Sequence, residues 1–113
     1  MVINDYKFGL IIVEGKEYYS DVIIYPTRVD DHWWRKEGHL VLPQDLEEVI
    51  KEEPALLIIG TGDSGLMKVP EETVRWIKSK KIELIIEPTS SACQSYNKFH
   101  QWKRTIAALH LTC

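Results

Sequence analysis

The chain has 113 residues, enough for one ordinary domain and too few for two. Apolar residues make up 44% of it and charged residues 27%, with a formal net charge of −3. Such a chain lacks the excess of lysine and arginine that neutralises phosphates, so no nucleic-acid partner is expected. No apolar run approaches the roughly 20 residues of a membrane span, so no membrane association is expected either.

The first residues and the cysteines bear on the cellular compartment. Residues 1–9, MVINDYKFG, have neither the basic start nor the apolar stretch of a signal peptide, so we expect a cytoplasmic protein. Cys93 and Cys113 are the two cysteines, too few for a disulfide framework. In a reducing cytosol two free thiols are the default, although one bridge between them stays open.

The N-terminal part of the chain has the composition of β-strands. Residues 6–13 and 16–25 are rich in β-branched and aromatic residues, and Glu14-Gly15 lies between them, which predicts a β-hairpin. Residues 26–42 are less regular.

Strands and helices alternate in the second half. Pro43 and Pro70 each begin a helical pattern with acids in its first turn. A third helix begins near Ser91, which is followed three residues later by Gln94 and so fits a capping box. The expected strands cover residues 55–60, 82–87 and 105–111. This order predicts βαβ crossovers and a mostly parallel core sheet in a single α/β domain, which the N-terminal hairpin makes mixed.

Residues 60–65, GTGDSG, follow the buried strand 55–60 and match the G-x-G-x-x-G spelling of a dinucleotide-binding turn. In that motif the helix begins beside the third glycine and points its positive end at the pyrophosphate. Here residues 66–69 separate Gly65 from Pro70, so the helix begins too late, and we expect no cofactor. We interpret the segment as a loop whose glycines permit positive φ, with a small-anion site on its N–H groups left open.

Cys93 is the sharpest candidate for chemistry. It falls in or beside the first turn of the third helix, where the positive helix end stabilises a thiolate and lowers the pKa of the thiol. If the glycine loop and this helix start follow neighbouring parallel strands, both lie at the sheet edge where α/β proteins form ligand crevices. The candidate crevice residues are Gly60, Thr61, Gly62, Asp63, Ser64, Cys93, Tyr96 and Asn97. The alternative is that Cys93 and Tyr96 are core residues without a chemical role. We favour this alternative for Cys93, because the sequence offers no base that could activate its thiol.

Residues 26–42 hold the remaining candidates. Arg35 and His39 are candidate anion contacts over the same crevice, or solvated loop residues. Trp33 and Trp34 are a candidate interface, because in an extended segment one of two adjacent side chains points away from whatever buries the other. The alternative is that the domain's own loop covers both.

Two further features concern the aromatic and metal-ligating residues. Trp76 and Trp102 are expected to pack at the core or its rim. The spacing of histidines and acids fits no strong metal signature, so no metal is expected.

Short motifs along the whole chain, in order, resemble one protein family. They are Phe8-Gly9, Tyr18, Asp21-Val22, Trp34-Arg35, Gly38-His39, Ile59-Gly60-Thr61-Gly62, Ala92-Cys93, Tyr96-Asn97 and Ala107-Ala108-Leu109-His110. Together they resemble the Mth938-domain family, catalogued as a domain of unknown function, DUF498. The resemblance implies a three-layer α/β domain over residues 1–113, with a mixed central sheet and an N-terminal β-hairpin followed by βαβαβ. It implies no established catalytic activity. Eukaryotic relatives include a mitochondrial complex I assembly factor and an adipogenesis-associated cytoplasmic protein. By analogy, the resemblance favours a role in binding or assembly.

The sequence therefore leaves two functions open. The first is a non-catalytic binding, interaction or assembly module with an unknown protein partner. The second is a small enzyme or small-anion-binding protein that uses Gly60–Gly62 and Cys93. The apolar strands near the N-terminus leave self-association into a homo-oligomer open as well.

Overall fold

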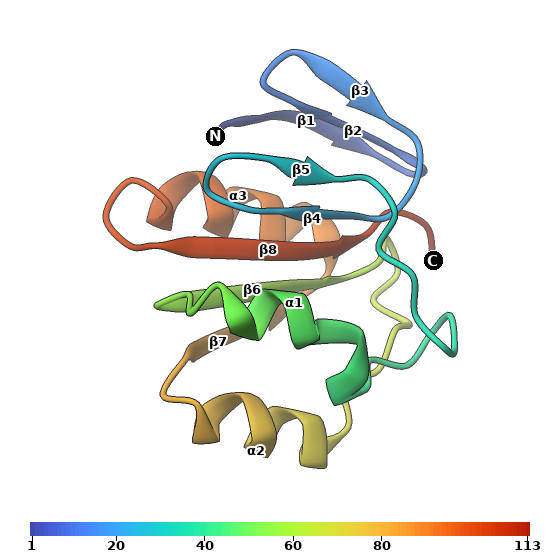
Figure 1. Cartoon of the computed structure of the whole chain (residues 1–113). Helices are drawn as coiled ribbons and strands as arrows, with labels where there is room; N and C mark the ends of the chain where they lie inside the picture. The colour runs from blue at the N-terminus through green and yellow to red at the C-terminus, as the bar shows by residue number, and fades with distance from the viewer.

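The computed structural model describes all 113 residues, which form three stacked layers (Figure 1). The middle layer is a five-stranded sheet in the order β5-β4-β8-β6-β7. A three-stranded antiparallel sheet, β1-β2-β3, and helix α3 cover one face, and α1 and α2 cover the other. The strands are β1 (Ile3–Lys7), β2 (Leu10–Val13), β3 (Lys16–Tyr18), β4 (Val22–Ile24), β5 (Val29–Asp30), β6 (Leu56–Thr61), β7 (Glu83–Glu87) and β8 (Thr105–His110). The helices are η1 (Pro43–Leu46), α1 (Glu47–Lys51), α2 (Glu71–Ser79) and α3 (Thr89–Phe99). The predicted three-layer α/β fold with a mixed sheet is confirmed.

Strand β6 lies at the centre of the molecule. All six of its residues are buried, and it pairs in parallel with both β7 and β8. Leu56 and Ile58 pack into the core on the α3 side, whereas Leu57 and Ile59 pack into the core on the α1 and α2 side. Because both faces are covered, the four residues from Leu56 to Ile59 are all apolar instead of alternating with polar residues.

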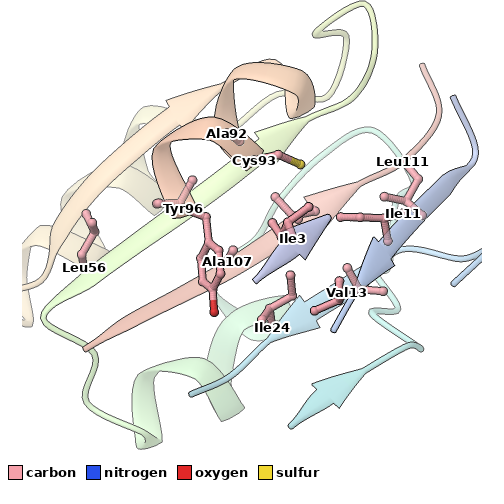
Figure 2. Close-up of a cluster of buried hydrophobic side chains, with 13 residues drawn as sticks. Ile3, Ile11, Val13, Ile24, Leu56, Ala92, Cys93, Tyr96, Ala107 and Leu111 are labelled. Carbon is pink, nitrogen blue, oxygen red and sulfur yellow. The ribbon is translucent and has the colours of Figure 1, made fainter. Parts of the chain in front are cut away.

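The core on the α3 side joins the two sheets. Ile3, Ile11 and Val13 of the smaller sheet pack against the central sheet together with Ala92 and Tyr96 of α3 (Figure 2). All five side chains are at most 5% exposed. Burial of this kind stabilises a domain by about 25 cal/mol per Å² of apolar surface, so the small sheet and α3 hold each other in place.

The N-terminal strands differ from the single predicted hairpin. Glu14-Gly15 does form a turn with positive φ, between β2 and β3. A further turn at Phe8-Gly9 divides residues 6–13 into β1 and β2, however, and residues 16–25 divide between β3 and β4, which belong to different sheets. Composition marks strands, but it does not say which sheet each one joins.

The start of α3 also differs from the prediction. The helix begins at Thr89, directly after Pro88, and no side chain caps it, so the predicted capping box of Ser91 and Gln94 is wrong. The α3 helix is the longest in the chain at 11 residues, and no helix has the length and apolar character needed to cross a membrane.

A substitution at Gly62 tests how closely the last residues pack on the glycine loop. Gly62 has a φ of +104°, and a Cβ there would lie 2.7 Å from the carbonyl oxygens of both Thr112 and Cys113. We expect Gly62→Ala to lower the free energy of unfolding by about 2 kcal/mol or more, because backbone strain adds to the clash. Gly38→Ala is the control, since open space surrounds its Cβ position. Equal urea midpoints for the two variants would contradict this packing.

Candidate functional site

Buried polar side chains meet where β4 begins and β8 ends. The two strands are antiparallel neighbours, so Asp21, just before β4, adjoins His110 at the end of β8. Asp21 Oδ2 lies 2.7 Å from Nη2 of Arg35 and 2.8 Å from Nδ1 of His110. A carboxylate only accepts hydrogen bonds, which assigns the proton of this contact to Nδ1 of His110. We call Asp21, Arg35 and His110 the Asp21 cluster.

The surroundings of Asp21 favour its ionised form. Burial alone would raise the pKa of this carboxyl, but hydrogen bonds from His110, the Leu111 amide and Arg35 hold the pKa below its ordinary value of 3.8. The side chains of Arg35 and His110 are only 5% and 7% exposed. Removing one partner of such a pair leaves the other charge buried and uncompensated, so the pair is a strong constraint on conformation.

Arg35 and Trp33 together fix the loop before η1. Arg35 Nε donates to the carbonyl of Gly38 at 3.0 Å, and its guanidinium carbon lies 4.5 Å from the centre of the Trp33 ring. The Trp33 amide donates to the carbonyl of Asp21 at 3.2 Å, and its Nε1 donates to the carbonyl of Asp45 at 3.0 Å. These contacts tie the loop both to the start of β4 and to η1.

Trp34 faces solvent from this fixed loop. It is 73% exposed, whereas Trp33 and Arg35 on either side are 5% and 8% exposed. Of the two alternatives that the sequence leaves open, the structure has the two tryptophans facing opposite ways, although their segment is an irregular loop and not a strand. A hollow of about 270 Å³ adjoins them, lined by Ser20, Asp21, Asp31, His32, Trp33 and Trp34.

His39 and Cys113 extend the Asp21 cluster outward. The His39 ring meets the His110 ring edge-on, with the ring centres 5.4 Å apart, and its Nε2 lies 3.8 Å from Cys113 Sγ. Arg35, a candidate for an exposed anion contact, is buried instead, because Asp21 holds it inside. The structure thus brings both predicted anion contacts to one edge, and anion binding by them stays a prediction.

The glycine loop and the start of α3 lie side by side, as the sequence predicts. The Gly62 amide donates to Thr89 Oγ1 at 2.8 Å, and the Thr89 amide donates to the Gly62 carbonyl at 3.0 Å. A Cβ at Gly60 would lie 2.8 Å from Thr89 Oγ1 and from a methyl of Leu109. Glycine at this position therefore allows the loop to approach α3 and β8.

The last residues of the chain close the glycine loop. The Asp63 amide donates to the Thr112 carbonyl at 2.7 Å, and the Leu66 amide donates to the Cys113 carbonyl at 3.2 Å. Thr61 is buried and its hydroxyl donates to the Glu87 carbonyl, whereas Asp63 and Ser64 are exposed. Protein oxygens already occupy several donors that a small anion would need, which removes the main support for an anion site in this loop.

Cys93 does not share a cavity with the glycine loop. It is 6% exposed and belongs to the core on the α3 side (Figure 2). The hollow beside it, of about 270 Å³, lies between β1 and α3 and is lined by Ile3, Asn4, Asp5, Tyr6, Ser90, Cys93, Gln94 and Asn97. None of residues 60–65 lines this hollow, so the structure does not bring Cys93 and the glycine loop into the predicted common crevice; Cys93 packs instead into the core shared by α3 and the smaller sheet.

The structure agrees with the favoured interpretation of Cys93 as a core residue and disagrees with the alternative of an activated thiol. Burial, together with the nearby charge of Asp5, raises its pKa to about 12. Loss of hydration thus outweighs the stabilisation that a helix start gives to a thiolate. Tyr96 is a core residue at 1% exposure, and Asn97 bonds both backbone groups of Ile3, so both side chains serve the contact between α3 and β1.

Asp21 and His110 are the site residues that the sequence analysis missed. Both lie at the edge that includes the carboxyl end of β6, where Thr61 pairs with His110. The rule that collects carboxyl ends of parallel strands at one edge, applied to residues 105–111, would have placed His110 there. Asp21 gives no such signal, because its position depends on the antiparallel direction of β4.

The fold and sheet order define a three-layer α/β domain of the Mth938 type. The chain belongs to the family described as "Protein of unknown function (DUF498/DUF598)", whose model matches residues 3–111. Its structure is similar to the conserved hypothetical protein PH1505 from Pyrococcus horikoshii OT3, with a TM-score of 0.86, 29% identity and 100% of both chains covered. It is also similar to a protein named MT938, with a TM-score of 0.82, 28% identity, and 99% of this chain and 98% of that chain covered. A third similar structure, a Bordetella pertussis protein described as a Mth938-like domain, has a TM-score of 0.68, 16% identity, and 97% of this chain and 85% of that chain covered.

Removing the negative charge of Asp21 tests its structural weight. We expect Asp21→Asn to lower the free energy of unfolding by about 3 kcal/mol, because Arg35 then stays buried without a counter-charge. Glu71→Gln is the matched control, since the Arg75–Glu71 pair has a similar distance of 2.8 Å but is largely exposed. The control should lose less than about 1 kcal/mol in the same urea titration. Similar losses in both variants would show that Asp21 is an ordinary surface acid.

The depressed pKa of Asp21 predicts a dependence of stability on pH. Because the pKa is lower in the folded chain than in the unfolded chain, ionised Asp21 contributes stability that is present above the unfolded value near 3.8. That contribution is lost as the pH falls through the folded value. Between about pH 5 and pH 2 the wild type should therefore lose more unfolding free energy than Asp21→Asn. Parallel curves from thermal unfolding at each pH would contradict the assignment.

Proposed function

We propose that this protein is a non-catalytic interaction module that binds a protein partner through Trp34 and the adjoining hollow. The observation that carries the proposal is the contrast between Trp34, 73% exposed, and its two neighbours, which are almost fully buried. A large exposed aromatic side chain costs a domain solubility, and tryptophan is enriched among the residues that dominate binding energy at interfaces.

The rigidity of the loop supports this use of Trp34. The hydrogen bonds of Trp33 and the ion pair of Arg35 with Asp21 hold the backbone on both sides of it. A segment ordered before binding loses less conformational freedom when the partner arrives. The buried cluster thus acts as the support for an exposed anchor.

The chemistry of the hollow favours a partner with a basic side chain. Asp31 contributes a carboxylate to its lining, whereas the Asp21 carboxylate, which also lines the hollow, is already paired with Arg35. The hydrogen bond from His32 holds the pKa of Asp31 below its ordinary value, so Asp31 is ionised at neutral pH. A lysine or arginine of the partner would lay its apolar stem on the Trp34 ring and direct its charge toward Asp31. An anionic ligand would be repelled at this surface.

Two further observations favour binding over catalysis. The Cys93 thiol, with a pKa raised to about 12, is not the activated nucleophile on which the enzyme alternative depended. Amides of the glycine loop donate to the chain's own oxygens, the Gly62 amide to the Thr89 hydroxyl and the Asp63 amide to the Thr112 carbonyl. We place the interaction in the cytoplasm, where two free cysteines such as those seen here are the rule.

Site-specific photo-crosslinking in cells tests this proposal. The full chain would carry benzoylphenylalanine in place of Trp34, or in place of Trp102 as the matched control, since Trp102 is 72% exposed but follows α3. We expect a discrete protein adduct from position 34 that position 102 does not give. The same adduct should disappear when Asp31→Lys reverses the charge of the hollow. Identical adduct patterns at the two positions, or no adduct at position 34, would refute the proposal.

A further inference from the structure

The two cysteines of the chain lie in opposite environments. Cys93 is buried in the core, whereas Cys113 is partly exposed and its Sγ lies 3.8 Å from Nε2 of His39. An imidazole nitrogen at this distance can accept the thiol proton, which is how a neighbouring histidine activates a cysteine nucleophile. The thiol on which the sequence analysis concentrated is therefore the inert one.

One short segment positions both members of the pair. The Leu66 amide donates to the Cys113 carbonyl at 3.2 Å, and the Lys68 amide donates to the His39 carbonyl at 2.8 Å. The Met67 amide between them donates to the carbonyl of Thr61, at the end of β6. The thiol and the imidazole are thus brought together by backbone hydrogen bonds anchored on the central strand, and not by a chance meeting of flexible side chains.

The buried cluster behind this pair supports it and leaves one donor unused. The His39 ring rests edge-on against His110, which Asp21 holds in place. Arg35 contacts both His110 and Asp21. Its side chain is only 5% exposed, and its Nη1 atom is buried without any hydrogen-bond partner. The thiol–imidazole pair therefore rests against a fixed, buried cluster.

We propose that Cys113 is a nucleophilic thiol, with His39 as its proton acceptor, and that it undergoes thiol–disulfide exchange with small disulfides. The Cys113 proton passes to His39 Nε2 while Sγ attacks one sulfur of the disulfide. A new sulfur–sulfur bond forms to Cys113, the original one breaks, and the leaving thiolate takes up the proton from His39. Cys113 is oxidised and the departing half of the disulfide is reduced, so no other oxidant is needed. This proposal does not rest on the proposed function, although the Asp21 cluster supports both this pair and the loop that carries Trp34.

The reaction of the native protein with 5,5′-dithiobis(2-nitrobenzoate), a disulfide that releases a coloured thiolate, tests the proposal. We expect one equivalent to react rapidly in the native chain and the second only after unfolding. Cys113→Ser should abolish the rapid phase, and Cys93→Ser should leave it unchanged. His39→Gln, which keeps a polar side chain but removes the base, should slow the rapid phase at least about tenfold. His32→Gln is the matched control, since His32 is also exposed but contacts Asp31, and it should react like the wild type.

Cys93 serves as an internal measure of folding in every variant. Its failure to react confirms that the core is intact, and His39→Asn provides a second variant if His39→Gln exposes Cys93. The proposal is overturned if the folded His39 variants react at the wild-type rate. It is equally overturned if the rapid phase persists in Cys113→Ser, or if neither thiol reacts before the chain unfolds.

Discussion

The carboxylate of Asp21 is the contact on which the candidate site depends. It accepts hydrogen bonds from Arg35, from His110 and from the Leu111 amide, and so joins the start of β4, the loop before η1 and the end of β8. These segments are far apart in the sequence, and the ion pair fixes the loop before η1 against the ends of two strands that are themselves buried in the cores. The Asp21–Arg35 ion pair holds this position because separating it would leave the buried guanidinium of Arg35 without a counter-charge.

Two exposed surfaces depend on the Asp21 cluster in different ways. On one side, the buried Trp33 and Arg35 hold the backbone that presents Trp34 to solvent. On the other, His110 supports the His39 ring beside Cys113. The edge of the sheet is thus built from the inside outward: a central strand with both faces covered, then a buried polar cluster, then the exposed groups to which we assign recognition and chemistry. The family to which the chain belongs carries no assigned activity, so these exposed groups are where its biochemistry should be sought.

The sequence predicted the fold well because its signals are local. Proline at the start of the first two helices, continuous apolar runs for buried strands and glycines at turns indicated the βαβαβ order, and the family resemblance supplied the layers. The side-by-side placement of the glycine loop and α3 followed from the same rule about parallel strands. The division of residues 16–25 between two sheets could not be predicted, because it depends on long-range packing of strands with similar composition.

The site was predicted only in part, because side-chain environment is not local. The helix-start rule suggested a reactive Cys93, but the rule takes no account of the smaller sheet that buries this thiol. Trp102 was expected to pack and is instead 72% exposed, because α3 ends at Phe99, before the predicted apolar stripe is complete. The pairing of Asp21 with His110 spans 89 residues and requires the direction of β4 to be known.

Residue-by-residue amide hydrogen exchange tests the central role of Asp21 most directly. The amides of Trp33 and Leu111 donate to the carbonyl and the carboxylate of this one residue. If Asp21 holds the edge together, the amides of Trp33 and Leu111 should exchange nearly as slowly as those of β6. The amide of Trp34, the exposed loop residue that follows Trp33, should exchange quickly. If Trp33 and Leu111 instead exchange as fast as Trp34, the cluster does not hold this edge of the sheet, and the account of both surfaces fails.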